Sequence, residues 1–356
     1  MAVTRPDQAS RGAKQAKQAK RATQATPTKQ AARAKQESKP ARQTPPAALE
    51  QQRMVTLLSA LAPQEGYNLT PLPTVRILRS DRALARTPVL YDPGIVIVCQ
   101  GRKRGYFGDQ VYLYDEQHYL AVAAPVPFTM ETDATPAHPL LAIYLHLDFQ
   151  LATELMMQID RHGRPLRDDT PQSMFSSPMD VDLRGSVLRF LEAMNRPLDA
   201  AVLGPALLRE LYFRILTGAQ GDALRAALAM QGRFGKIGKA LRHIHAHYAQ
   251  DLDLSALASE AGMSVPSFHT HFKAITRASP MQYVKSTRLH QARLLMVRQD
   301  MTVEAACNAV GYASPSQFNR EFKRLFGRTP AAETRRMRSS FAVPPAHAAS
   351  VFVSSH

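Results

Sequence analysis

The fold of the C-terminal third is decided by the stretch LSALASEAGMS, residues 254–264, and by a second copy, VEAACNAVGYAS, residues 303–314. In both copies apolar residues recur at i, i+3, i+4 and i+7, which predicts a short helix with one buried side. A glycine follows in each, Gly262 or Gly311, and tolerates the left-handed backbone of a tight helix exit. The next serine, Ser264 or Ser314, is suited to cap another helix. Each stretch therefore predicts a helix, a tight turn and a second helix.

The residues after each serine repeat as well. The positions expected to face inward on the second helices are Val265, Phe268 and Phe272 in the first copy, and Pro315, Phe318 and Phe322 in the second. A helix, a glycine turn and a capped helix make a helix-turn-helix unit, which presents its second helix to the major groove of DNA. Two copies about 50 residues apart predict a DNA-binding domain with two recognition helices.

The charge of the chain supports that prediction. The 356 residues carry a formal net charge of +16, which favours a polyanionic partner. Counting along the sequence gives +9 for residues 1–47, −2 for residues 48–233 and +9 for residues 234–338. The positive charge is thus confined to two blocks, and only the second contains the repeated helices.

Five segments are expected. Residues 1–53 form a basic disordered tail, since they contain almost no large apolar side chains. This tail is a nonspecific phosphate-binding arm or a dispensable extension, and translation beginning at Met54 is a third reading. Residues 54–180 form a β domain, 181–232 a helical region of two helices for packing or dimerisation, 233–338 the DNA-binding domain, and 339–356 a C-terminal tail.

The β domain is predicted from short apolar runs separated by turn residues. The strands expected are at residues 94–101, 111–114, 119–124 and 140–147. Such spacing is typical of a small barrel or sandwich. The fold class is therefore α+β, with an N-terminal β-barrel or sandwich followed by helices and an all-α C-terminal domain.

Residues 237–338 resemble the DNA-binding domain of the AraC/XylS transcription regulators. The resemblance lies in the Ala-Gly-Met-Ser turn, the Phe-Lys pairs, the long helix at residues 281–298 and the closing Gly327-Arg328-Thr329-Pro330. On that long helix Leu289, Ala292 and Met296 share one face, whereas Lys285, Arg288 and Arg293 lie elsewhere. Residues 87–104 resemble the cupin-like N-terminal domain of one branch of the family. The resemblance implies a regulator of transcription, such as an activator, controlled by a small-molecule effector.

The outward faces of the second helices supply the candidate DNA contacts. The base-reading candidates are Pro266, Ser267, His269 and Thr270 in the first unit, and Ser316, Gln317, Asn319 and Arg320 in the second. Asparagine and arginine match the hydrogen-bonding edges of adenine and guanine. The phosphate-binding candidates are Lys273, Lys323 and Arg324, near helix ends. Pro266 stands where the superfamily often has a large side chain, and offers only apolar contact.

Cys99 is a possible sensor of oxidants or electrophiles. It lies on an expected buried strand close to Arg102, Lys103 and Arg104, whose charge could lower its thiol pKa. The alternative is a small apolar residue of the core. With only two cysteines, a disulfide framework is excluded.

Two other functions are alternatives to regulation. A cupin-type metal enzyme needs a His-x-His pair with further ligands. His118, His138 and His146 are isolated from one another, and the group His243, His245 and His247 falls on a helix of the DNA-binding block. We therefore expect no enzyme activity, metal or cofactor. A nonspecific nucleoid-associated protein is the second alternative, and would not need two ordered helix-turn-helix units.

The partners expected are double-stranded promoter DNA, an unknown small-molecule effector, RNA polymerase and a second copy of the chain in a homodimer. No stretch is long and apolar enough to suggest a membrane span. The sequence thus predicts a bacterial cytoplasmic protein associated with the nucleoid.

Overall fold

The computed structural model describes residues 46–163, 172–229 and 232–340. Most of the two expected tails, residues 1–53 and 339–356, lies outside the described residues, which include only residues 46–53 and 339–340 of them. Residues 46–53 form the first two turns of helix α1, Pro46–Leu61, so the tail boundary expected at residue 53 is wrong. The helix is held in place because Met54 and Leu58 on it are buried. At the other end, helix α13 extends to Ser340.

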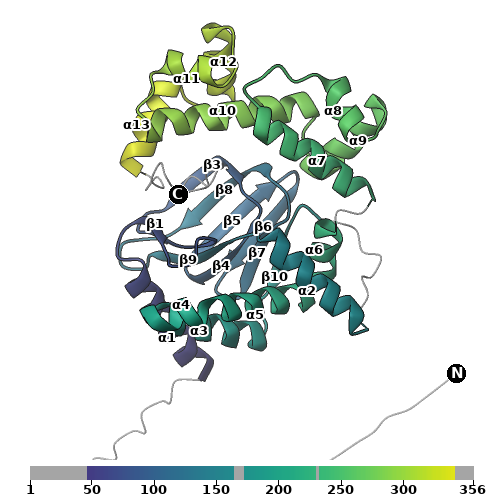
Figure 1. The fold of residues 1–356 in the computed structure, drawn as a ribbon. Helices are drawn as coiled ribbons and strands as arrows, with labels where there is room; N and C mark the ends of the chain where they lie inside the picture. The colour runs from purple at the N-terminus through teal and green to yellow at the C-terminus, as the bar shows by residue number, and fades with distance from the viewer. Residues whose placement is uncertain (1–45, 164–171, 230–231, 341–356) are drawn as a thin grey trace, which may run out of the picture. The chain divides into compact units, whose positions relative to one another are not determined.

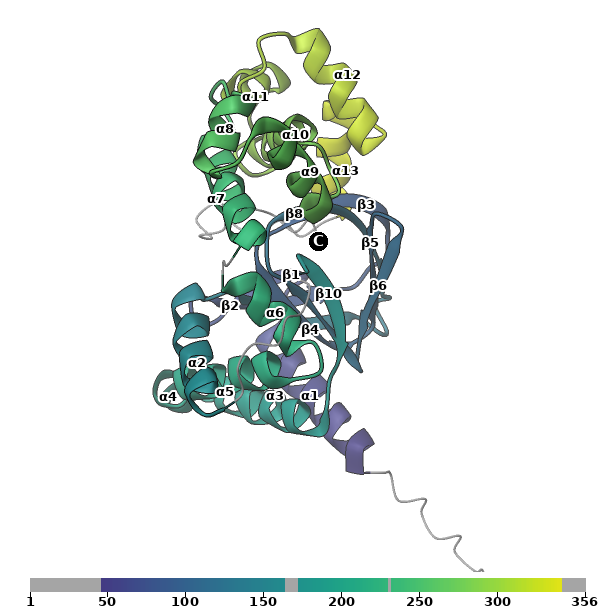
Figure 2. The same cartoon turned by 90° about the vertical axis from the view of Figure 1, so that its right-hand side faces the viewer.

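An antiparallel sheet of ten strands, strongly curled, occupies the N-terminal half of the described residues (Figures 1 and 2). The strands are β1 Gly66–Leu69, β2 Val75–Ser80, β3 Leu84–Tyr91, β4 Gly94–Gln100, β5 Arg102–Phe107, β6 Gln110–Asp115, β7 His118–Val122, β8 Val126–Asp133, β9 Leu140–His146 and β10 Met174–Pro178. Their order is β1-β2-β9-β4-β7-β6-β5-β8-β3, and β10 pairs with β7. The four strands expected from sequence correspond to β4, β6, β7 and β9.

The sheet has a different apolar cluster on each face, because successive side chains of a strand point to opposite sides. On β4, Val96 and Val98 belong to a cluster that includes Phe128 of β8. The intervening Ile97 and Cys99 belong to a second cluster, shared with the helices that cover the sheet. The curled sheet is therefore buried on both faces along β4.

Helices follow and flank the sheet. They are α2 Phe149–Arg161, α3 Val181–Met194, α4 Pro197–Val202, α5 Gly204–Thr217 and α6 Gly221–Leu228. Residues 181–229 thus contain four helices where two were expected. The chain breaks because Pro197 and Pro205 stand in the first turns of α4 and α5, where a proline starts a helix but cannot continue the preceding one.

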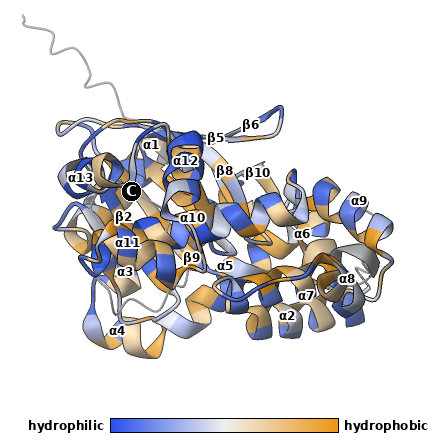
Figure 3. Cartoon of the chain, turned by 90° about the horizontal axis from the view of Figure 1, so that it is seen from above, coloured by the Kyte–Doolittle hydropathy of each residue, from blue (hydrophilic) through white to orange (hydrophobic). Residues whose placement is uncertain are grey.

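The C-terminal part is all helical. It comprises α7 Gly232–His247, α8 Leu254–Glu260, α9 Val265–Thr276, α10 Pro280–Arg298, α11 Val303–Ala309, α12 Pro315–Phe326 and α13 Pro330–Ser340. The two helix-turn-helix units are α8–α9 and α11–α12, and α10 connects them (Figure 1). Helices α9 and α12 carry both hydrophobic and hydrophilic residues in Figure 3, consistent with helices buried on one side only.

The turns inside the two units confirm the role expected of the glycines. Gly262 has a φ of +60° and Gly311 a φ of +80°. A Cβ atom on Gly311 would lie 2.2 Å from the carbonyl oxygen of Ala249, so no larger residue fits there. Among the described residues, no helix combines the length and apolar character that crossing a membrane requires.

Candidate nucleic-acid interface

The first recognition helix, α9, begins after Ser264 and buries Phe268 and Phe272. This leaves Pro266, His269 and Thr270 exposed, whereas Ser267 is half-buried. Two expectations for this helix were wrong. Val265 does not face inward, since it is 37% exposed, and the side chain of Ser264 makes no capping hydrogen bond.

The second recognition helix, α12, follows the predicted pattern more closely. Ser314 caps it, since its hydroxyl oxygen accepts a hydrogen bond from the backbone N–H of Gln317 at 3.3 Å. The four base-reading candidates on this helix are all exposed, namely Ser316, Gln317, Asn319 and Arg320. Phe318 and Phe322 are fully buried on the opposite side, whereas Pro315, which was expected to face inward with them, is exposed. The outer face of α12 therefore presents polar side chains on a helix anchored by its inner face.

The phosphate-binding candidates lie beside these faces. Lys273, Lys323 and Arg324 are exposed. A shallow hollow of about 400 Å³ runs along α9 and is lined by His269, Thr270, Lys273, Ala274 and Arg277. The base-reading candidates His269 and Thr270 thus lie next to the phosphate-binding candidate Lys273. This arrangement is suited to contact with the bases and the backbone of one DNA strand.

Glu321 orients the second unit and was missed by sequence reasoning. Its carboxylate accepts hydrogen bonds from Lys285 Nζ of α10 at 3.0 Å and from the Tyr312 hydroxyl group at 2.7 Å. Burial raises the pKa of Glu321, but these hydrogen bonds outweigh burial and lower it. An ionised carboxylate thus ties α12 to the connecting helix. The sequence offered only one indication of this role, the position of an acidic residue between Phe318 and Phe322, which are both buried.

The connecting helix also contacts the β domain. Arg293 was expected off the face that carries Leu289, Ala292 and Met296, and its side chain, only 1% exposed, is buried by other contacts. Both terminal nitrogens of its guanidinium donate to the Pro88 carbonyl oxygen of β3 at 3.2 Å, and Nη1 lies 3.5 Å from Glu333 of α13. Burial lowers the pKa of Arg293 to about 10. Sequence reasoning did not predict this burial, because Pro88 lies 205 positions earlier in the chain than Arg293.

A polar cluster lies where the β domain meets the end of α10. We call Arg76, Asp92, His146 and Arg298 the interdomain polar cluster. Burial raises the pKa of Asp92 well above its usual value, although the charges of Arg76 and Arg298 oppose this shift. Burial and the charge of Arg76 lower the pKa of His146 to about 4. The Asp92 Oδ2 and His146 Nε2 atoms are 3.6 Å apart.

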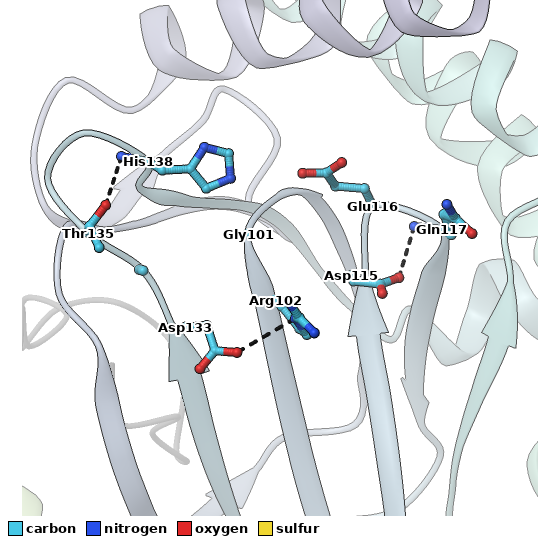
Figure 4. A pocket seen from close by; sticks show the side chains of 9 residues that line it. Gly101, Arg102, Asp115, Glu116, Gln117, Asp133, Thr135 and His138 are labelled. Carbon is cyan, nitrogen blue, oxygen red and sulfur yellow. Dashed lines mark hydrogen bonds and ion pairs between the residues drawn. The ribbon is translucent and has the colours of Figure 1, made fainter.

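A second hollow, of about 470 Å³, opens at one end of the sheet (Figure 4). Arg102 lies beside Asp133 at its edge, while His138 and Glu116 extend from different loops. Within the described ranges, no group of three or more His, Cys, Asp or Glu side chains could hold a metal ion. Of the clustered histidines, His243 pairs with Glu260 at 2.8 Å.

Cys99 does not have the lowered pKa that a reactive thiol requires. It faces the helices and is completely buried, and burial raises its pKa to about 12. The premise of a lowered pKa was wrong because burial of the thiol outweighs the opposing charge of Arg184. Arg102 and Arg104 then pair with carboxylates of β8. The packing of Cys99 is that of a core residue.

Comparison with known proteins connects these features. The family model described as "AraC-type transcriptional regulator N-terminus" matches residues 71–223. A second family model, described as "Helix-turn-helix domain", matches residues 257–336. The thermoregulatory protein LcrF of Yersinia pestis is 23% identical over 67% of this chain and 87% of its own length. The RCS-specific HTH-type transcriptional activator RclR of Escherichia coli is 30% identical over 51% of this chain and 66% of its own.

The HTH-type transcriptional regulator AlkR of Acinetobacter baylyi is 32% identical, but the match spans only 31% of its length. Among solved structures, an apo form of ToxT from Vibrio cholerae superposes with a TM-score of 0.52 at 8% identity. That match covers 76% of this chain and 99% of ToxT, so the two share a fold over both domains.

Proposed function

The chain belongs to the AraC/XylS family of transcriptional regulators, and on that premise we propose that it reads specific promoter sequences through α9 and α12. It is a DNA-binding regulator of transcription. The exposed residues of the two recognition helices would contact base edges, and Lys273, Lys323 and Arg324 would contact phosphates.

One observation carries this proposal: two recognition helices with exposed polar faces are held by a single helix of 19 residues, α10. At 1.5 Å per residue α10 is about 28 Å long, close to the roughly 34 Å of one turn of DNA. The two helices could therefore enter successive major grooves on one side of a duplex. A protein that binds DNA only through charge would not need this spacing.

The test is selection of bound fragments from random duplex DNA by the full chain, followed by mapping of bound sites in the genome. We expect a motif with two parts about one helical turn apart. Binding that is equal for all sequences and falls steeply with salt would instead support the nonspecific nucleoid-associated alternative. Repeating the selection without residues 1–45 would show whether the basic segment adds affinity.

We further propose that the N-terminal domain binds a small-molecule effector, since a curled sheet with buried polar groups precedes the DNA-binding helices. The alternative, a response to a reactive species through Cys99, has less support because that side chain is buried. Purified protein should show ligand-dependent DNA affinity. We assign the chain no enzymatic activity, because its relatives are transcription regulators.

A homodimer is proposed through the helices that follow the sheet. Leu198 is 73% exposed, Val202 66% and Leu203 49%, all on or next to α4. Together they form an apolar patch suited to a second copy of the chain. Sedimentation of the wild type and of Val202→Glu would test this. We also propose that the regulator works in the bacterial cytoplasm on nucleoid DNA and contacts RNA polymerase there.

A further inference from the structure

The side-chain amides on the outer face of α12 are both held by other groups of the same helix. Nε2 of Gln317 donates a hydrogen bond to Oε1 of Glu321 at 3.3 Å. Nδ2 of Asn319 donates one to the carbonyl oxygen of Pro315 at 2.9 Å. Gln317 and Asn319 are exposed, so both amides would face DNA under the proposed function. The two hydrogen bonds therefore influence which atoms of these amides meet the bases.

The partners of the two amides fix their orientation, because each partner can only accept a hydrogen bond. The Pro315 oxygen is a backbone carbonyl, which has no proton to donate. Burial raises the pKa of Glu321, but its hydrogen bonds, including the one from Gln317, outweigh burial and lower the pKa. Glu321 is thus ionised at neutral pH, and an ionised carboxylate only accepts. The nitrogen of each amide, with both of its hydrogens, therefore lies at the inner end, and the oxygen lies at the other end.

Glu321 is itself held in place, so the packing of the unit sets the orientation of Gln317. The side chain of Glu321 is only 9% exposed. Its Oε1 atom also accepts a hydrogen bond from Nζ of Lys285 at 3.0 Å, and its Oε2 atom accepts one from the Tyr312 hydroxyl group at 2.7 Å. A carboxylate that is fixed at both oxygens cannot follow a rotation of the Gln317 amide. The oxygen of that amide is therefore the atom left for DNA.

The four bases differ in what they offer to such an oxygen in the major groove. Adenine presents an amino group at N6 and cytosine presents one at N4, and both groups donate hydrogen bonds. Guanine presents the acceptors O6 and N7, and thymine presents the acceptor O4 and a methyl group. An outward carbonyl oxygen therefore pairs with adenine or cytosine and is repelled by guanine or thymine. Arg320 has only donors, so it has the opposite preference.

We propose that α12 recognises amino-bearing bases, adenine or cytosine, through the outward oxygens of Gln317 and Asn319, and that Glu321 sets this specificity at Gln317. Glu321 is a positioning residue, since it acts by holding the nitrogen of the Gln317 amide. A glutamine with a free amide would pair with both N6 and N7 of adenine and would distinguish adenine from cytosine. This inference rests on the proposed reading of DNA by α12 and adds the chemical class of the bases that it reads.

Competition binding of the full chain to a panel of duplexes at fixed salt tests the proposal. The panel starts from the site that the wild type selects from random DNA, and carries each of the four base pairs in turn at every position. Gln317→Ala identifies the base pair read by Gln317, because the preference at that position is lost in this variant. A variant that keeps every preference of the wild type would overturn the proposal.

At the base pair read by Gln317 the proposal predicts how the four duplexes are grouped. We expect the wild type to bind duplexes with adenine or cytosine on one strand about tenfold more tightly than duplexes with guanine or thymine on that strand. Adenine and cytosine should differ by less than about threefold, because both present an amino group. Any other grouping, such as adenine alone above the other three bases, would overturn the proposal.

Glu321→Gln tests the positioning role with little change in shape. The new amide can donate as well as accept, so the Gln317 amide is free to turn its nitrogen toward DNA. We expect the preference at this base pair to fall at least about threefold, and the preferences elsewhere to stay as they are. Each preference is a ratio of affinities within one protein, so partial unfolding of a variant does not change it. A wild-type preference in Glu321→Gln would show that Glu321 only stabilises the unit.

Two further proteins control for indirect effects. Glu304→Gln removes an exposed carboxylate from α11 of the same unit, and should leave every preference unchanged. Glu321→Gln combined with Gln317→Ala should show the same preferences as Gln317→Ala alone, because the residue through which Glu321 acts is gone. An additional change of preference in the double variant would mean that Glu321 acts by another route, and would overturn its assigned role.

The same panel separates this inference from the proposed function. Equal binding of every duplex by the wild type would contradict sequence reading by α9 and α12. A clear sequence preference of the wild type that is not grouped by amino-bearing bases would leave the proposed function intact, and would overturn only the inference on Gln317 and Glu321.

Discussion

The hydroxyl group of Tyr283 lies 2.7 Å from the carbonyl oxygen of Pro125 and donates a hydrogen bond to it. Tyr283 belongs to α10, and Pro125 precedes strand β8. The same hydroxyl oxygen lies 2.5 Å from Nε2 of His245 on α7, where it can accept a second hydrogen bond. One buried side chain therefore joins two helices of the DNA-binding domain to the β domain.

Removal of this hydroxyl group should loosen the contact between the domains. We expect Tyr283→Phe to lower the free energy of unfolding by about 1 to 3 kcal/mol, because it removes both hydrogen bonds of a buried hydroxyl group. Urea denaturation measures the change. Tyr248→Phe, on a half-buried ring in the same domain, is the matched control and should have a smaller effect. Equal effects of the two variants would mean that the bond to Pro125 contributes little.

Arg320 should carry sequence information, whereas Lys323 should not. Both side chains are exposed on α12. We expect Arg320→Ala to cost about 1 to 3 kcal/mol at the selected site, since an arginine can pair with both acceptors of a guanine. Lys323→Ala should weaken binding to selected and random DNA alike. Electrophoretic mobility shifts at fixed salt measure both. If Arg320→Ala weakened both DNAs equally, its assignment to base reading would be wrong.

His245 should make the protein less stable in acid. Burial lowers its pKa to about 3, while the unfolded chain has a pKa near 6.5. Below pH 6.5 the unfolded state takes up a proton that the folded state does not, so stability falls as the pH drops from 6.5 toward 3. The slope is about 1.4 kcal/mol per pH unit for this residue.

Urea denaturation between pH 7 and pH 5 checks this slope. His245→Asn should flatten the curve, and His138→Asn, at an exposed position, should leave it unchanged. An unchanged slope in His245→Asn would show that other groups cause the loss of stability in acid.

Cys99 should be unreactive in the folded protein. Its pKa of about 12 keeps the thiol protonated, and the side chain is fully buried. We expect iodoacetamide at pH 8 to label it only after unfolding in urea, as followed by mass spectrometry of the peptide. Promoter activity in cells that carry Cys99→Ser should respond to oxidants and aldehydes as in the wild type. A lost response would restore the sensor hypothesis.

The two helix-turn-helix units differ at the residue after their recognition helices. Gly327 ends α12 with a φ of +74°, whereas Arg277 ends α9 with a φ of +57°. A side chain in this left-handed conformation is strained, so Arg277→Gly should stabilise the protein by about 1 kcal/mol relative to Arg277→Ala. Both variants lack the arginine side chain, so the difference in their thermal unfolding isolates the effect of the backbone conformation. Equal stability would show that the turn is unstrained.

The sequence predicted the features that depend on local patterns. The two helix-turn-helix units, the glycine turns and the buried faces of Phe268 and Phe318 follow from spacing within about a dozen residues. The separate starts of α4 and α5 could have been anticipated from Pro197 and Pro205. Strands β2, β3 and β8 were harder to predict, since Arg76, Thr87 and Thr132 interrupt their apolar patterns yet are buried.

Contacts between distant residues could not be predicted in this way. Nothing near Arg293 in the sequence indicates Pro88, and nothing near Asp92 indicates Arg298. The base-reading residues remain predictions, because exposure on a helix is necessary for reading DNA but does not demonstrate it.

The contact between Arg293 and Pro88 lies on a different element from the exposed faces of α9 and α12. Contact with the β domain and the proposed reading of DNA therefore use separate sets of side chains. An exchange of the outward residues of the two recognition helices would redirect the regulator to other promoters while the β domain kept its hold on α10. Under the proposed function, a few surface substitutions would thus place a new set of target genes under an existing signal.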